Sequence, residues 1–200
     1  MWKSAKTLEE LEEKAKGLGL GNFSFDGYTG KESLKIGNET AEHFHDLFNK
    51  FPKLKEELGE KQKLRKFWIT KDLHIAEDAF GRYYSNDFAI DIGGGQLKEH
   101  YLKLGKNFSI GKDYFSTARH EFGHHLQENV LMKDDFKDKV WRKIAEKENV
   151  YDFFEKNVSK YASSNVQEAF AESFSAYTSP KYKRGMLPKE IEKYFDDLFK

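Results

Sequence analysis

The stretch Ser116–Gln127, STARHEFGHHLQ, places three histidines and one glutamate within the six residues His120–His125. In a helix, residues four apart lie on one face about a turn from each other, so His120 and His124 can direct their rings at one point. This HExxH arrangement lets two neutral imidazole nitrogens bind a zinc ion. Glu121 would then lie beside the metal-bound water, whose proton it can accept as a general base. The stretch therefore predicts a helix that carries two zinc ligands.

Two further residues of this helix need separate explanations. His125 lies about 100° further round the helix than His124, so we expect it to point away from the metal and to serve a structural role. Gly123 costs a helix about 1 kcal/mol relative to alanine. A close approach by a substrate or by another backbone beside the metal would explain the glycine.

The motif alone leaves an alternative open, in which the histidines lie on a solvated helix face and pair with nearby carboxylates. A catalytic zinc site has three protein ligands and a water, so a third ligand elsewhere in the chain would favour the metal. The 200 residues include no cysteine. Histidine and carboxylate side chains are therefore the strong metal ligands that remain.

A second unusual stretch, Tyr161–Pro180, contains neither lysine nor arginine, although the chain has 34 of these residues. As a helix it places Glu168 and Glu172 together among small residues, and no basic residue lies three or four positions away from them. The alternative is an ordinary amphipathic helix with exposed acids. Taken together, the two helices predict a zinc site of His120, His124 and Glu168, in which Glu172 orients one of the histidine rings.

These two stretches resemble a known family. HEFGH, followed about forty residues later by YASSNVQEAFAESF, is similar to the gluzincin metallopeptidases related to the catalytic domain of anthrax lethal factor and to the Pro-Pro endopeptidases, which share a Tyr-x6-Glu-x2-Ala-Glu segment. Similar segments occur in zincin-like domains of phage head-morphogenesis proteins. The match covers about 116–130 and 161–177, and the first hundred residues match only loosely. Ala169 stands where an aromatic residue is common in lethal factor. This difference does not affect the ligands, but it leaves the subfamily undecided.

The resemblance implies a zincin-like fold and a zinc-dependent endopeptidase with one zinc ion per chain on the three ligands named above. It implies the general base Glu121, a carboxylate behind the ligands at Glu172, and a Tyr161 hydroxyl that stabilises the oxyanion. A second hypothesis is a zincin scaffold kept as a structural or protein-binding module, for example in a phage particle, with little hydrolysis. Glu121 favours the enzyme, because a binding module does not need a general base.

The first half of the chain predicts the sheet of an α+β fold. We expect one helix from about Thr7 to the glycines of GLGLG at 17–21, and a second from about Asn38 through Phe51. Short aromatic or β-branched runs predict strands of a small, twisted, mixed sheet at 22–28, 66–70, 80–84 and 87–92.

From Tyr114 onward the pattern is helical, with helices expected at 116–130, 136–148, 164–177 and 189–199. We expect a single domain over 1–200, in which about 1–110 hold the sheet and about 111–200 form a helical part with the zinc site.

The resemblance also implies a partner, because in zincins an edge strand of the sheet commonly aligns the extended polypeptide substrate by backbone pairing. The candidate strand is Asn86–Ile92, NDFAIDI, which lacks lysine and arginine. The alternative is that this segment is an ordinary interior strand.

Charge and composition indicate which other classes of partner are not expected. Lysine plus arginine and aspartate plus glutamate both number 34, so no net field attracts nucleic acid or an anionic membrane. We see neither a signal peptide nor an apolar run long enough to span a membrane. We expect a monomer without nucleic-acid or membrane partners, which is either cytoplasmic or a fragment of a larger or secreted protein.

Overall fold

The computed structural model describes residues 1–57, 63–71, 81–93, 115–131 and 134–200. The chain divides into two compact units, Met1–Lys98 and Glu99–Lys200. The predicted change from a sheet part to a helical part falls near this boundary, whereas a single domain stays a prediction. Within the described ranges, no helix combines the length and the apolar character needed to cross a membrane.

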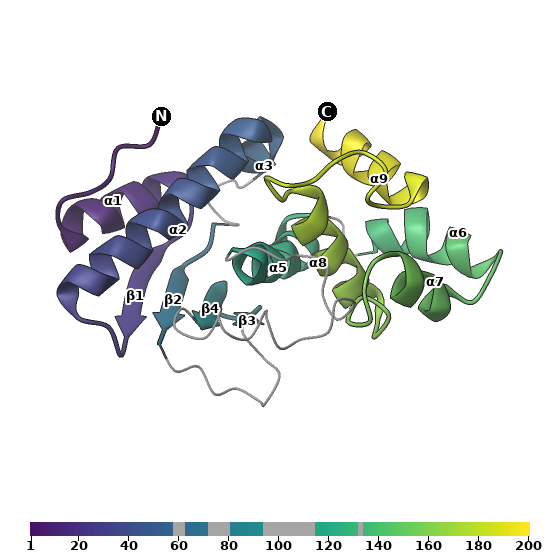
Figure 1. Cartoon of the computed structure of the whole chain (residues 1–200), viewed down its shortest axis with the longest axis horizontal. Helices are drawn as coiled ribbons and strands as arrows, with labels where there is room; N and C mark the ends of the chain where they lie inside the picture. The colour runs from purple at the N-terminus through teal and green to yellow at the C-terminus, as the bar shows by residue number, and fades with distance from the viewer. Residues whose placement is uncertain (58–62, 72–80, 94–114, 132–133) are drawn as a thin grey trace. The chain divides into compact units, whose positions relative to one another are not determined.

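The first unit contains a four-stranded mixed sheet (Figure 1). β1, β2 and β4 run parallel, and β3 pairs antiparallel with β4. The α+β class with a small mixed sheet is thus confirmed. The strands are β1 (Asn22–Asp26), β2 (Lys66–Thr70), β3 (Gly81–Tyr84) and β4 (Ala89–Gly93), and the helices are α1 (Leu8–Leu18), α2 (Gly30–Lys50) and α3 (Pro52–Glu57).

Capping residues decide where the first two helices begin. The Thr7 side chain accepts a hydrogen bond from the amide of Glu10 at 3.1 Å, so α1 begins where it was expected. The second helix was expected from about Asn38 but begins eight residues earlier. The carboxylate of Glu32 accepts from the Thr29 amide at 3.0 Å, and this N-terminal cap was overlooked in the sequence.

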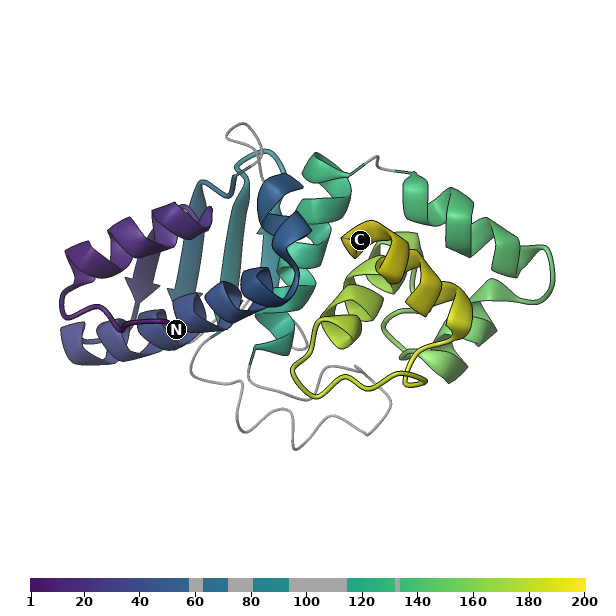
Figure 2. The same ribbon diagram turned by 90° about the horizontal axis from the view of Figure 1, so that it is seen from above.

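Both helices lie on the same face of the sheet (Figures 1 and 2). Gly37 of α2 sits where they meet β1: a Cβ there would lie 2.4 Å from the Leu11 side chain and 2.7 Å from the Phe25 ring. Only glycine permits this approach. Phe44 of α2 packs edge-on against Phe67 of β2, with ring centroids 5.8 Å apart, and both side chains are fully buried. Aromatic contacts of this kind form the core of the first unit.

The prediction that Asn86–Ile92 supplies an edge strand is wrong. β4 pairs with β2 on one side and with β3 on the other, so it is an interior strand. Ile90 and Ile92 are buried, and Phe88 adopts a positive φ of 49° in the turn before the strand. Burial of Ala89, Ile90 and Ile92 accounts for the apolar residues of the segment. Among the described strands, the edges of the sheet are β1 and β3.

The described residues of the second unit form helices joined by turns and loops. The helices expected around 116–130, 136–148, 164–177 and 189–199 all form, the first two with π-helical segments. A further helix, α7, was not predicted, although Asn149 caps it by accepting from the amides of Tyr151 and Asp152. The elements are α5 (Ser116–His125), η1 (Leu126–Val130), η2 (Lys137–Trp141), α6 (Arg142–Ala145), α7 (Val150–Asn157), α8 (Val166–Tyr177) and α9 (Lys189–Phe199).

An aromatic core joins these helices. Phe136, Phe154, Phe170, Phe174 and Phe195 come from different parts of the second unit, and each is at most 1% exposed. The Phe136 ring lies edge-on to Phe170 at 5.4 Å, and Phe170 lies 5.6 Å from Phe195. This core holds α8 in place, so the polar residues on the remaining face of α8 have fixed positions.

Candidate metal centre

Helices α5 and α8 pack closely against each other. A Cβ on Gly123 would lie 3.1 Å from the Cα of Ala171 and 3.2 Å from the Phe174 ring. The glycine therefore admits another backbone, which was one of the two explanations predicted for it. Residues 169–177 are all buried. The lack of lysine and arginine in 169–177 thus agrees with the burial of this part of the helix on all sides.

Buried polar contacts connect the same two helices. The Ser175 hydroxyl donates to the carbonyl of Ser116 at 2.8 Å, and the Arg119 Nε donates to the carbonyl of Ser175 at 3.0 Å. Arg119 is fully buried, directly before the first histidine of the motif. No sequence pattern predicted this role for Arg119. These bonds fix the rotation of α5 relative to α8.

The packing brings one histidine-rich face of α5 to the acidic face of α8. His120, His124 and Glu168 form a group whose ligand atoms could hold a metal ion. The Nε2 atoms of the two histidines are 3.1 Å apart, and the Glu168 Oε2 lies 3.0 Å from one and 3.3 Å from the other. A tetrahedral zinc with bonds of about 2.0 Å separates neighbouring ligand atoms by about 3.3 Å. The triangle therefore has nearly the size that zinc requires.

The carboxylate of Glu168 gives a second test of the fit. Its Oε2 is buried and makes no hydrogen bond of acceptable geometry, although two imidazole nitrogens lie close to it. Buried polar atoms without a partner are rare and costly. The Nε2 atoms of His120 and His124 and the Oε2 of Glu168 lie close enough together to bind one cation, which would give this oxygen a partner. The donor set of two imidazoles and a carboxylate also suits zinc.

The electrostatics of the group favour a positive charge at its centre. Burial raises the pKa of Glu168, but the imidazoles of His120 and His124 beside it outweigh this and lower the pKa to about 2. Burial lowers the pKa of His120, yet the carboxylates of Glu168 and Glu172 raise it well above the ordinary value. The carboxylates around His120 thus favour positive charge, which a divalent cation can supply in place of a proton on the imidazole.

Glu172 lies behind His120, where the sequence placed it. Its Oε1 is 2.9 Å from the His120 Nδ1, and its Oε2 accepts from the Ser159 hydroxyl at 2.8 Å. Ligating histidines in proteins are usually oriented by such a carboxylate. Ser159 was not predicted, since a serine carries no signal until its partner is known. Asn165 was not predicted either; its side chain caps α8 by accepting from the Glu168 amide at 2.9 Å.

Tyr161 and Glu121 lie at the same cluster. The Tyr161 ring stacks on His120, with centroids 5.5 Å apart and planes inclined by 27°, and Tyr161 is 38% exposed. Burial and the carboxylates of Glu168, Glu121 and Glu172 raise the pKa of Tyr161 above its ordinary value. A tyrosine hydroxyl is protonated at neutral pH and can donate a hydrogen bond, and the raised pKa extends this range to more alkaline pH.

His125 lies outside the cluster, as predicted. It is fully buried, and its ring lies 5.9 Å from that of Phe122 in the core of the second unit. This position agrees with the structural role expected from the 100° turn between neighbouring helical residues.

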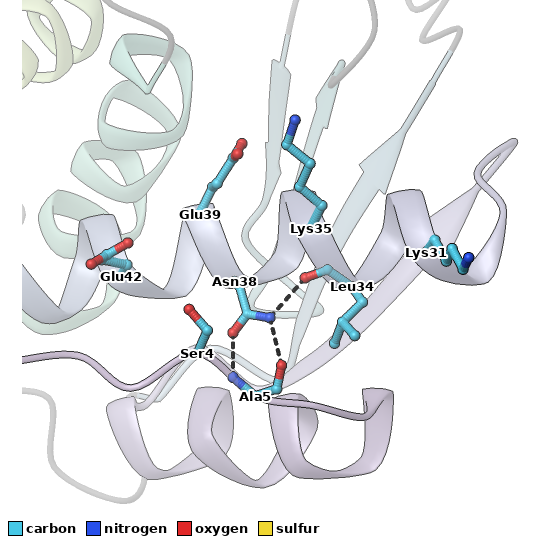
Figure 3. A pocket seen from close by; sticks show the side chains of 8 residues that line it. All are labelled: Ser4, Ala5, Lys31, Leu34, Lys35, Asn38, Glu39 and Glu42. Atoms are coloured by element: carbon cyan, nitrogen blue, oxygen red, sulfur yellow. Dashed lines mark hydrogen bonds between the residues drawn. The ribbon is translucent and has the colours of Figure 1, made fainter.

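A pocket in the first unit has no group of metal-binding side chains like that of His120, His124 and Glu168 among its lining residues (Figure 3). It lies between the N-terminal segment and α2. Asn38 at its base accepts from the Ala5 amide at 2.7 Å and donates to the carbonyls of Ala5 and Leu34 at 3.0 and 2.9 Å. This amide therefore fastens the N-terminal segment to α2.

Comparison with known proteins adds no relative. No protein-family model matches the chain, and a search of curated proteins finds no match. No family is assigned. The resemblance to gluzincins thus rests on the motif residues and their spacing, and it remains a hypothesis.

Proposed function

We propose that this chain is a zinc-dependent endopeptidase with a zincin-like site of the gluzincin type. The observation that carries the proposal is the triangle of His120, His124 and Glu168, with its orphaned carboxylate oxygen. A solvated helix face, the alternative left open by the motif, would not bury this oxygen or orient a ring through Glu172.

Each remaining residue of the cluster has a role in peptide hydrolysis. A bound zinc polarises a carbonyl and lowers the pKa of a water to about 7. Glu121 accepts the proton of the attacking water and returns it to the leaving amine. Tyr161 donates a hydrogen bond to the oxygen of the scissile carbonyl as negative charge develops there. Glu172 holds the His120 ring in place.

The proposed substrate is a polypeptide in extended form, paired with a sheet edge of a monomeric enzyme.

The first experiment is the zinc-to-protein ratio of the purified chain, measured by mass spectrometry of metals. We expect one zinc per wild-type chain and clearly weaker retention in Glu168→Ala. Glu155→Ala, which removes an exposed glutamate from α7 of the same unit, is the matched control and should retain zinc. A wild-type chain that takes up no zinc after reconstitution would contradict the proposal.

Catalysis is tested separately with a fluorescently labelled, denatured casein, whose fragments are identified by mass spectrometry. Glu121→Gln should keep its zinc and lose about 10²- to 10⁴-fold in turnover, because only the general base is removed. One zinc per chain without cleavage of any peptide would favour the second hypothesis, a zincin scaffold that serves as a structural or protein-binding module.

A further inference from the structure

Ser159 follows α7 and is only 1% exposed. Its hydroxyl takes part in two hydrogen bonds: it accepts from the amide of Ala162 at 3.0 Å and donates to the Oε2 of Glu172 at 2.8 Å. We infer that Ser159 is a positioning residue of the metal centre, which fixes Glu172 and, through it, the protonated nitrogen of His120. The inference rests on the proposed zinc site, since it concerns how that site is held.

The backbone amide sets the direction of the whole chain of hydrogen bonds. An amide N–H can only donate, so the Ser159 oxygen is the acceptor toward Ala162 and its own proton is left for Glu172. The other oxygen of Glu172 then accepts from the Nδ1 of His120, 2.9 Å away. A neutral imidazole has one proton, and with that proton on Nδ1 the lone pair stands on Nε2. Nε2 is the nitrogen that faces His124 and Glu168.

The same hydroxyl shapes the turn that carries Tyr161. The bond from the Ala162 amide to Ser159 spans Tyr161, and the Ser164 amide donates to the Tyr161 carbonyl at 3.1 Å. The Tyr161 ring stacks on His120 from this turn. Ser159 thus links the residue proposed to bind the oxyanion to the residue that orients a ligand.

The test is a zinc affinity measured by competition with a chromophoric chelator. Ser159→Ala should raise the zinc dissociation constant about tenfold, because loss of a partner that orients a ligand typically costs 10- to 100-fold. Ser159→Thr keeps the hydroxyl and should restore the wild-type value. Ser163→Ala is the matched control: its hydroxyl lies in the same turn but donates to the carbonyl of Lys160. It should bind zinc as the wild type does.

A second measurement needs no variant. In the zinc-loaded wild type, nitrogen-correlated NMR of the imidazoles should find the His120 proton on Nδ1. A proton on Nε2, or equal zinc affinity in Ser159→Ala and the wild type, would overturn the inference and leave the proposed zinc site standing. Absence of zinc binding by the wild type would overturn both.

Discussion

Glu168 contributes a carboxylate whose properties depend on two imidazoles from another helix. No lysine, arginine or histidine lies within one turn of Glu168 on its own helix. The sequence therefore indicated that this carboxylate has a partner from another part of the chain. The partners lie on α5, at 3.0 and 3.3 Å from Oε2. Residue type and spacing were thus sufficient to predict which side chains meet. Ser159 could not be predicted in this way, because its hydroxyl acts only through the Glu172 oxygen it contacts.

Tyr161→Phe removes a single hydroxyl and so tests its proposed role in stabilising the oxyanion. The Tyr161 hydroxyl is protonated and able to donate at neutral pH, and its raised pKa keeps it so at more alkaline pH. Its removal should lower kcat on labelled casein about 10²- to 10³-fold, the usual cost of one oxyanion donor. Zinc content and KM should change little. Tyr151→Phe, at an exposed tyrosine of α7, is the control; unchanged turnover of Tyr161→Phe would remove this residue from the mechanism.

At the scale of elements, the site depends on how closely α5 and α8 approach. The helical pattern of each was evident in the sequence, and so was the anomaly of a glycine inside α5. The structure adds that Ala171 is the neighbour at the crossing. Small residues on α8 and a glycine on α5 let histidines and acids from the two helices converge.

Gly123→Ala is expected to destabilise the protein, although alanine favours helices. The new Cβ would lie 3.1 Å from the Ala171 Cα, and overpacking of this kind costs about 1–3 kcal/mol. The gain of about 1 kcal/mol in helix propensity offsets only part of it. Gly17→Ala is the control, since a Cβ in α1 meets nothing within 4 Å and should stabilise. Urea unfolding measures the free energy of unfolding of both variants. If Gly123→Ala stabilised the protein as much as Gly17→Ala does, α5 and α8 would not be tightly packed.

The segment before α9 is fastened to that helix by ion pairs that depend on pH. Arg184 hydrogen-bonds Asp196 and, with Tyr177, lowers the pKa of that carboxyl despite a small opposing effect of burial. A carboxyl whose folded pKa lies below its unfolded value of about 3.9 stabilises the fold above that pH. The stabilisation is lost as the pH falls through the folded pKa.

Urea midpoints of the wild type and Asp196→Asn should therefore differ at pH 7 and converge as the pH falls through the lowered folded pKa of Asp196. Asp152→Asn, an exposed aspartate on α7, serves as a control for the loss of one charge. A difference between wild type and Asp196→Asn that persists at low pH would mean that the aspartate acts through packing and not through its charge.

At the scale of the whole molecule, we expect zinc binding to raise the free energy of unfolding. A ligand that binds only the folded state stabilises it by about 2.7 kcal/mol at a free concentration 100 times its dissociation constant. For a chain of this size that corresponds to a rise of about 5–10 °C in Tm. Calorimetry with zinc and with a chelator should reveal the shift. Glu168→Ala should lose it, and a shift of equal size in that variant would place the zinc elsewhere.

The sequence by itself predicted most of the elements and the residues of the candidate metal site. Helical periodicity, the spacing of four between His120 and His124, and a long stretch without basic residues are local patterns, and local patterns follow from backbone geometry. Tertiary structure decided what depends on pairing across the chain. β4 became interior because two strands from elsewhere pair with it, and Ser159 gained a role because folding set its hydroxyl 2.8 Å from Glu172.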